Sequence, residues 1–337
     1  MFNTNYEPVD LSVWQGRIDS ESDFDAFRWH QWVKKIDLRK DDLTPYNGKL
    51  GFAFIGFCCD KGIKLNKGRI GASKGPRSIR KELTNLPCCF TKEVKLFDAG
   101  NILCKGISLE EGQNLLSKAV EKILNLNLFP IVLGGGHETA FGNYGGILNH
   151  LSRKTSKPNI GIINFDAHFD IRPYENGGTS GTMFRQISDV CKEHSLNYSY
   201  LCLGIQKHSN TVYLFKTAEK LGVEYILAKD IIGNDTWSIL EKISDFMKHK
   251  DHIYVTICSD VFSSAFAPGV SAAQPLGIDP EVALKFLKFI LRSNKVISFD
   301  ICEVSPRFDH DNTTASLASV IIFSLVNTLS KIFNLSM

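Results

Sequence analysis

Short runs of apolar residues recur along the chain with the length expected of buried β-strands. They lie at residues 51–57, 94–97, 129–133, 160–165, 199–203, 252–257 and 295–299. Continuous apolar runs of this length are typical of strands in a parallel sheet that is covered on both faces, because each side chain is then buried whichever way it points.

The segments between these runs have the periodicity of amphipathic helices. The clearest is 109–124, which opens with a capping box formed by Ser108 and Glu111. Further helices are predicted at 211–221, 236–249, 280–291 and 315–333. Strands that alternate with helices predict an α/β fold, in which a parallel sheet lies between two layers of helices.

The start of the chain lacks this alternation and carries Trp14, Trp29 and Trp32 among many charged residues. We expect residues 1–50 to form an N-terminal arm of turns and one helix that packs on the main body. Residues 51–337 then form a single domain, because their length suits one large α/β domain.

Composition excludes several classes of protein. The apolar fraction of 43% and the charged fraction of 22% are typical of a compact chain. The net charge is only +3 and the basic residues are scattered, so we expect no nucleic-acid partner. No apolar run approaches the roughly 20 residues that cross a bilayer, and the acidic start is unlike a signal peptide. We therefore expect no membrane partner and a cytoplasmic location.

The cysteines give no sign of a disulfide framework or of a thiolate zinc site. There are nine, dispersed along the chain, and two adjacent pairs, Cys58-Cys59 and Cys88-Cys89, are poorly suited to a set of bridges. No CxxC pair is present. We expect most of them to be buried as small apolar side chains.

Chemically active residues directly follow four of the apolar runs. In chain order they are His137 and Glu138 after the glycines 134–136, then Asp166, His168 and Asp170, then Cys258 and Asp260, and last Asp300 and Glu303. In an open parallel sheet, ligands bind outside the carboxyl ends of the strands, so these side chains are expected to meet at one edge.

Their chemistry favours a metal centre. On an extended segment the spacing of Asp166, His168 and Asp170 points all three side chains the same way. Imidazole and carboxylate suit Mn, Fe, Co, Ni or Zn, and the oxygen-rich balance favours Mn(II). Each motif alone has an ordinary alternative, since a His after a glycine turn is commonly a hydrogen-bonded loop residue and an Asp at a strand end commonly caps a helix. The occurrence of all four motifs in this order favours the metal.

The motifs resemble those of the ureohydrolases, the arginase-like superfamily that includes arginase and agmatinase. The matching segments are GGGHE at 134–138, NFDAHFD at 164–170, SDVF and APGVSA at 259–262 and 267–272, and DICEVSP to DHD at 300–311. The resemblance covers nearly the whole chain. It implies a three-layer α/β/α fold with a central, mainly parallel eight-stranded sheet, two manganese ions at the strand ends, and a homo-oligomer, either a trimer or a hexamer.

Other segments resemble one branch of that superfamily, the formimidoylglutamases. They are WQGRIDS at 14–20, NKGRIGA at 66–72 and TSGTMFRQI at 179–187, and Phe184 stands where arginases carry a histidine thought to shuttle protons. The branch implies hydrolysis of a small molecule, N-formimidoyl-L-glutamate, to L-glutamate and formamide in histidine degradation.

Carried over position by position, the resemblance also implies roles for individual residues. His137, Asp166 and Asp170 would hold one metal, and His168 and Asp260 would help to hold the other, with Asp166 bridging both. Asp170 would also orient the attacking hydroxide and pass its proton to the leaving amine. Glu303 would hold the cationic NH groups of the substrate.

Cys258 departs from the family pattern. In the fourth motif two aspartates normally lie two residues apart and the first bridges both metals, but here that first position is Cys258. A thiolate is a soft ligand that Mn(II) disfavours, although thiolates can bridge Zn or Fe. Four outcomes stay open: a weakened two-metal site, a single metal at His137, Asp166 and Asp170, a softer metal, or a Cys258 that ligates nothing.

The glutamyl part of such a substrate carries two carboxylates, which arginine binds in a bidentate manner. Arg172, Arg69 and Arg185 are the candidates, and Ser180 occupies the loop position that binds the substrate carboxylate in related enzymes. For each arginine alone, a surface or intersubunit salt bridge is an equally good interpretation.

Two other functions remain open at this point. An agmatinase or other guanidino-acid amidinohydrolase would share the metals, although the arginines argue against a cationic tail. A pseudoenzyme with an impaired metal site, acting as a partner in an oligomer, is favoured only by Cys258.

Overall fold

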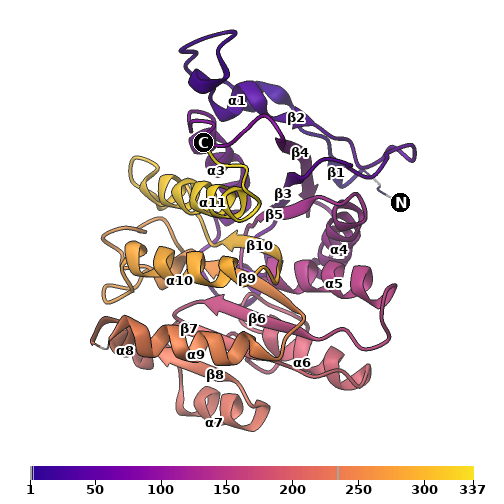
Figure 1. The fold of residues 1–337 in the computed structure, drawn as a ribbon. Coiled ribbons are helices and arrows are strands. Elements are labelled where there is room, and N and C mark those ends of the chain that lie inside the picture. Colours follow the sequence, from indigo (N-terminus) through magenta and orange to yellow (C-terminus); the bar gives the residue numbers. More distant parts are fainter. Residues whose placement is uncertain (1, 3, 234) are drawn as a thin grey trace.

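The computed structural model describes residues 2, 4–233 and 235–337. Within them lies a ten-stranded sheet in the order β1-β4-β3-β5-β10-β9-β6-β7-β8, with β2 also pairing with β4 (Figure 1). The described strand pairs are parallel except for β1 with β4. Strands β3 to β10 make up the eight-stranded sheet that the resemblance implied, and the arm adds the two short strands β1 and β2.

The seven predicted strands are all present, and most extend a little further than their apolar runs. The strands of the main body are β3 (Leu50–Cys58), β4 (Val94–Leu103), β5 (Phe129–Leu133), β6 (Ile160–Phe165), β7 (Tyr200–Ile205), β8 (Glu224–Leu227), β9 (His252–Cys258) and β10 (Val296–Cys302). The sequence pattern missed β8, because this strand has only four residues at the edge of the sheet and two of them, Glu224 and Tyr225, are exposed.

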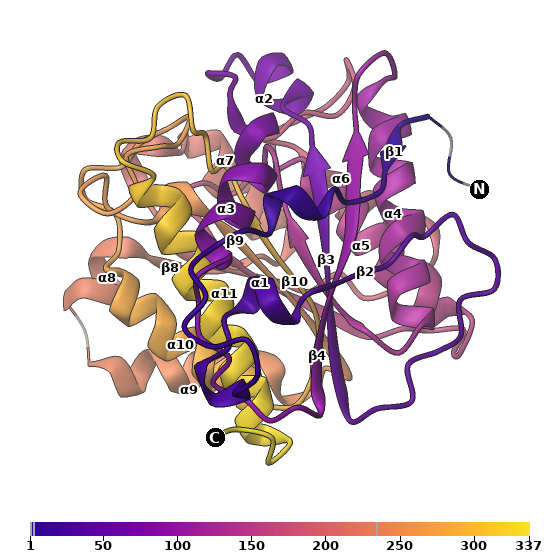
Figure 2. The same cartoon turned by 90° about the horizontal axis from the view of Figure 1, so that it is seen from above.

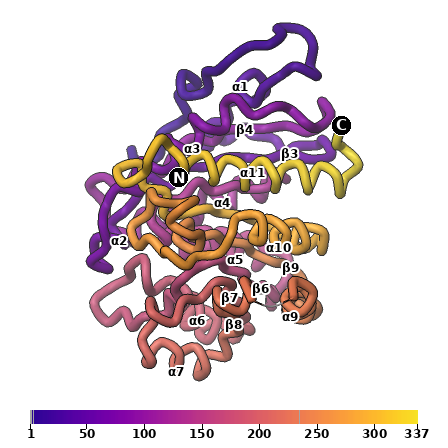
Figure 3. The backbone as a smooth tube through the Cα atoms, turned by 90° about the vertical axis from the view of Figure 1, so that its left-hand side faces the viewer, coloured from indigo at the N-terminus to yellow at the C-terminus, as the bar shows by residue number. Residues whose placement is uncertain are grey.

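Helices cover both faces of the sheet and confirm the three-layer architecture (Figures 1 and 3). On one face α4 (Leu109–Asn125), α5 (Thr139–Ser152) and α6 (Met183–Glu193) pack in a row. On the other face the row is α3 (Gly75–Leu83), α11 (Thr313–Ile332), α10 (Pro280–Arg292) and α9 (Thr236–Lys248). The remaining helices are α1 (Trp29–Trp32), α2 (Lys61–Leu65), α7 (Val212–Leu221) and α8 (Ala228–Gly233).

The capping box predicted at Ser108 is present. The Ser108 hydroxyl accepts a hydrogen bond from the backbone N–H of Glu111, and the Glu111 carboxylate accepts one from the N–H of Ser108. Because this pairing satisfies two of the free N–H groups at the helix start, it fixes where α4 begins.

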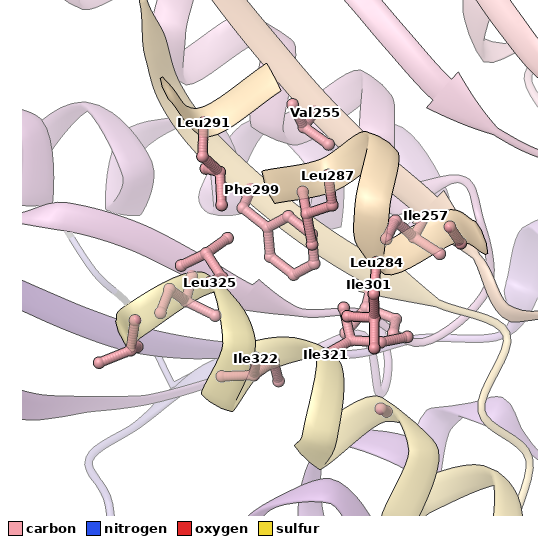
Figure 4. Packing of buried hydrophobic residues seen from close by; sticks show 14 of the residues in the cluster. Val255, Ile257, Leu284, Leu287, Leu291, Phe299, Ile301, Ile321, Ile322 and Leu325 are labelled. Carbon is pink, nitrogen blue, oxygen red and sulfur yellow. The ribbon is translucent and has the colours of Figure 1, made fainter. Parts of the chain in front are cut away.

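The α10 and α11 helices bury one face of the two central strands (Figure 4). Val255 and Ile257 of β9 and Phe299 and Ile301 of β10 are at most 1% exposed and face this layer. The next residues along each strand therefore point to the opposite face.

By length and composition, α11 would be able to span a membrane, and the sequence prediction overlooked this. Most of its apolar stretch is buried in the body, where Ile321, Ile322 and Leu325 join the core beside β10 (Figure 4). It is therefore placed as a core helix.

The first fifty residues lie along the β4 edge of the sheet (Figure 2). Their three tryptophans hold them there. Trp29 is fully buried against the rings of Phe54 and Phe323, and the indole N–H of Trp14 donates to Asp98 Oδ2 at 2.8 Å. The core cluster runs without a break from Trp14 and Trp29 into β3 and α11.

Candidate metal centre

The four polar motifs meet because the strands that precede them are neighbours. Strands β5, β10, β9 and β6 are consecutive in the sheet, although they are far apart in the chain. All of them are parallel, so their carboxyl ends lie at one edge. The predicted side chains are gathered there, and nearly all are buried.

His137 forms the first half of the cluster. Its Nδ1 lies 3.0 Å from Asp166 Oδ2 and 3.1 Å from Asp170 Oδ2. Its backbone N–H donates to Glu303 Oε1 at 2.9 Å, which places the Glu303 carboxylate beside the cluster. Two predicted carboxylates thus lie against one imidazole nitrogen, and a third, that of Glu303, lies against the backbone of the same residue.

His168 forms the second half. Its Nδ1 lies 3.2 Å from Asp260 Oδ2 and 3.4 Å from Asp166 Oδ1. The two oxygens of Asp166 therefore face different histidines, which is the geometry that a bridging carboxylate requires.

The backbone that presents these residues differs from the expected extended strands. Strand β6 ends at Phe165, before the three predicted ligands that follow it. Asp170 and Glu303 both have a positive φ, of 51° and 67° respectively. Asp260 lies in the 3-10 turn η5 (Ser259–Val261) that follows β9. The side chains converge all the same, but through loop conformations that simple alternation does not describe. Left-handed backbone is uncommon for residues other than glycine and is found where a site demands it.

Cys258 points into the cluster from the end of β9. Its sulfur and the ligand atoms of His137 and Asp166 lie within 4.8 Å of one another, and its side chain is 1% exposed. Burial, with the nearby carboxylate of Asp166, raises the pKa of this thiol well above its ordinary value. A cation in the cluster would favour the thiolate instead.

The charges of the cluster oppose and stabilise one another. Burial alone would lower the pKa of His137, but Asp166 and Asp170 hold it well above its ordinary value. Burial would likewise raise the pKa of Asp166, yet the hydrogen bonds from His137 and His168 hold it far below its usual range. Burial raises the pKa of Asp170 to about 6. A concentration of negative charge held in place by two histidines is suited to a metal cation.

The donor set fits one or two metal ions. Three groups of ligand atoms lie close enough to hold an ion among the described residues, and two of them, His137-Asp166-Cys258 and Asp166-His168-Asp260, share Asp166. Within the part of the chain that the structure describes, Asp260 Oδ1 and Glu303 Oε2 are buried without a hydrogen-bond partner. Buried oxygens without partners are costly in a protein that holds nothing there.

Of the predicted carboxylate-binding residues, Arg172 lies best for that role. It lines a cavity of about 330 Å³ together with Asn66 and Tyr174, just after Asp170 in the chain. Ser180 is buried in the loop that continues toward α6. A larger cavity, of about 770 Å³, lies between the arm and α3, and none of the predicted site residues lines it.

The other two arginines are engaged elsewhere. The guanidinium of Arg69 donates to the carbonyls of Ser271 and Val270 and lies over the ring of Phe308. Arg185 forms a 3.8 Å ion pair with Asp189 one turn along α6. Neither lines the cavity that holds Arg172.

The sequence analysis placed Asp300 after its strand, but Asp300 lies within β10, in a buried polar network next to His137 that the sequence analysis overlooked. Tyr254 and Thr256 of β9 and Asp300 of β10 are fully buried and hydrogen-bonded to one another, and Asn143 of α5 joins them. The sequence does contain a sign of this network, because β9 and β10 are otherwise apolar but carry a polar residue at every second position.

Comparison with known proteins agrees with this arrangement. Residues 50–327 match the sequence model of the arginase family. The chain belongs to the arginase family. A formimidoylglutamase of Clostridium tetani is 69% identical over 338 residues, which covers 100% of both chains. A formimidoylglutamase of a Geobacillus species is 43% identical over 314 residues, with 93% of this chain and 94% of the relative covered.

Solved structures share the fold of this arginase-family chain. The formimidoylglutamase of Bacillus subtilis superposes with a TM-score of 0.77 at 22% identity, covering 94% of this chain and 96% of the other. A Trypanosoma cruzi formiminoglutamase solved with Mn²⁺ superposes with a TM-score of 0.72 at 23% identity, covering 86% and 97%.

Proposed function

We propose that this protein is a manganese-dependent hydrolase that converts N-formimidoyl-L-glutamate and water to L-glutamate and formamide. The observation that carries the proposal is the buried cluster of two histidines and three aspartates at one edge of the sheet, with Glu303 beside it. The full-length relatives named formimidoylglutamase support this choice of substrate within the family.

In this proposal His137, Asp166 and Asp170 would hold one Mn²⁺, and Asp166, His168 and Asp260 would hold a second. Manganese, when bound, would supply a nucleophile at neutral pH by lowering the pKa of water. Asp170 would orient the attacking water and pass its proton to the amine of the departing glutamate. Glu303 faces the cationic NH groups of the amidine, where its carboxylate stabilises the charge that shifts during attack.

The substrate tail is proposed to lie in the cavity lined by Arg172. Its two carboxylates match a guanidinium in charge and in bidentate geometry. Ser180 is proposed to add a hydroxyl donor, while Arg69 and Arg185 remain weaker candidates, because both are already engaged with other groups.

The test is a comparison of substrates. The purified protein supplied with Mn(II) should release formamide from N-formimidoyl-L-glutamate and leave arginine and agmatine largely unchanged. Faster turnover of either guanidine would instead make it an agmatinase or another amidinohydrolase.

A second candidate function is supported by Cys258 alone. If the thiol has impaired the centre, the protein is a pseudoenzyme that acts as a partner in an oligomer. Metal analysis separates the two cases, because a protein that retains the centre should carry manganese, or a softer metal, after reconstitution.

We also propose a homo-oligomer, a trimer or a hexamer, in the cytoplasm. The nine cysteines are all free, which suits a reducing compartment. Exposed apolar side chains such as Val212, Tyr213 and Leu276 are available for contacts between subunits. Sedimentation analysis and cell fractionation would test these two proposals.

A further inference from the structure

The paired strands β9 and β10 carry a ladder of polar side chains on one face. Their register places Ser298 opposite Tyr254, Asp300 opposite Thr256 and Cys302 opposite Cys258. The residues between them point to the opposite face, into the apolar layer of α10 and α11 (Figure 4). A polar ladder inside a sheet is costly unless every group in it is paired.

Asp300 is the best-paired member of the ladder. Its Oδ2 accepts hydrogen bonds from the Tyr254 hydroxyl and from Asn143 Nδ2, the latter at 2.7 Å. Its Oδ1 accepts from Thr256 Oγ1 at 2.5 Å and from the Cys302 thiol at 3.4 Å. The orientation of the Asn143 amide is fixed in turn, since its Oδ1 accepts from the Ser298 hydroxyl.

Four donors around two oxygens is the pattern of an ionised carboxylate, which can only accept. Burial raises the pKa of Asp300, and the hydrogen bonds from Thr256, Tyr254 and Asn143 act in the opposite direction. The third group of possible metal-binding atoms, His137-Asp300-Cys302, is therefore a hydrogen-bonded network, with Thr256 between the carboxylate and the imidazole.

This arrangement decides which nitrogen of His137 carries a proton. Thr256 has one hydroxyl proton and gives it to Asp300, so at its 3.0 Å contact with His137 Nε2 it can only accept. His137 Nε2 must then be the donor. When the imidazole is neutral, as a metal ligand must be, its lone pair is therefore on Nδ1, which is the nitrogen that faces Asp166 and Asp170.

We propose that Thr256 and Asp300 are positioning residues that hold His137 in the tautomer and orientation in which Nδ1 is free to bind the metal. They form a carboxylate-hydroxyl-histidine chain that leads from the interior of the sheet to the metal centre. Partners of this kind fix the ring of a metal-binding histidine and strengthen it as a ligand. The inference rests on the proposed metal centre, and it adds two residues, Thr256 and Asp300, that orient a metal ligand without touching the metal.

Two measurements on four proteins test the proposal. The parent, Thr256→Val, Thr256→Ser and Tyr254→Phe are stripped of metal and titrated with Mn(II), and free manganese is followed by electron paramagnetic resonance. The Val variant keeps the shape of the side chain but lacks the hydroxyl, whereas the Ser variant keeps it. Tyr254→Phe is the matched control, because it removes another buried donor to Asp300 and leaves the chain to His137 intact.

Thr256→Val should weaken manganese binding at the His137 site by about tenfold to hundredfold, with binding at the His168 site unchanged. Thr256→Ser should restore it, and Tyr254→Phe should lose thermal stability without a comparable loss of affinity. Equal losses in Thr256→Val and Tyr254→Phe would overturn the proposal, as would an unchanged affinity in a folded Thr256→Val protein. A parent that binds no manganese would instead refute the proposed function.

The second measurement does not depend on metal. In the metal-free protein with ¹⁵N-labelled histidine, a slowly exchanging proton should appear on His137 Nε2 in the parent and in Thr256→Ser, and should exchange rapidly in Thr256→Val. A parent without a proton on that nitrogen would contradict the assignment even if the metal is bound.

Discussion

At the scale of single residues, the least ordinary feature is Cys258, a thiol in a cluster that is otherwise made of oxygen and imidazole ligands. If the loss of a hard bridging ligand limits the centre, Cys258→Asp should tighten Mn(II) binding and raise activity at limiting metal. Asp260→Ala should weaken whatever metal is bound. Metal titration combined with an assay of formamide release measures both.

The Cys258→Ala variant is needed to explain a negative result with Cys258→Asp. If Cys258→Asp binds no more manganese than the parent, Cys258→Ala distinguishes the remaining cases. If the Cys258 thiolate is a metal ligand, Cys258→Ala should lose both metal and activity. If Cys258 is a buried residue that binds no metal, the variant should keep both.

Arg172 is the residue that we propose binds the carboxylates of the substrate tail. Arg172→Ala should raise KM by about tenfold to a hundredfold and leave kcat largely unchanged, because it removes charge-assisted hydrogen bonds to the tail. Arg185→Ala is the matched control, since its guanidinium pairs with Asp189. A parent-like KM in Arg172→Ala, together with a raised KM in the control, would contradict the proposal and indicate that the substrate tail binds at Arg185 on α6.

The residues with chemistry of their own could be found from sequence, because each directly follows an apolar run. His137, Asp166 and Asp260 were located in this way. Thr256 and Asp300 could not be given a role, since their importance depends on the pairing of β9 with β10, which lie about forty residues apart in sequence. Only the register reveals that the two side chains meet.

At the scale of elements, the N-terminal arm is attached to the body by a few specific contacts. Trp14 donates from its indole N–H to Asp98, a fully buried carboxylate that also forms an ion pair with Arg80 at 2.7 Å. Trp14→Phe keeps a ring but removes that donor, so the free energy of unfolding should fall by about 1–3 kcal/mol.

Urea denaturation followed by circular dichroism measures this loss. Trp237→Phe is the control, because its side chain is 75% exposed and should change stability by no more than about 0.5 kcal/mol. An equal effect of the two changes would mean that the arm is held by packing alone. We propose that residues 1–50 are an extension of the single domain 51–337, because their buried side chains share its core.

Helix α5 was missed for another reason than β8, namely its glycines. Helix α5 contains Gly142, Gly145 and Gly146, which read as a loop. A Cβ on Gly146 would lie 2.6 Å from the carbonyl oxygen of Ser117, so glycine lets α5 approach α4 closely. The low helix propensity of glycine is overcome here by tertiary packing, which cannot be predicted from the local sequence pattern.

At the scale of the whole molecule, the sheet order brings the site together. Strands β5, β10, β9 and β6 come from distant parts of the chain, and only their parallel pairing places four loops at one edge. The α/β class followed from alternating patterns and the eight-stranded sheet from the family resemblance, but the strand order came from the structure. That edge carries the candidate metal ligands, and Arg172 follows one of them, Asp170, by two residues in the chain.

The most direct measurement is formamide release by metal-stripped protein as Mn(II) is added back. With N-formimidoyl-L-glutamate as substrate, release should be absent without metal, rise with added manganese and saturate. Asp166→Ala, which removes the carboxylate shared by both histidines, should stay inactive at every concentration. Undiminished release by the stripped protein, or full binding of manganese by the parent with no release, would contradict the assignment of this cluster as the hydrolytic centre.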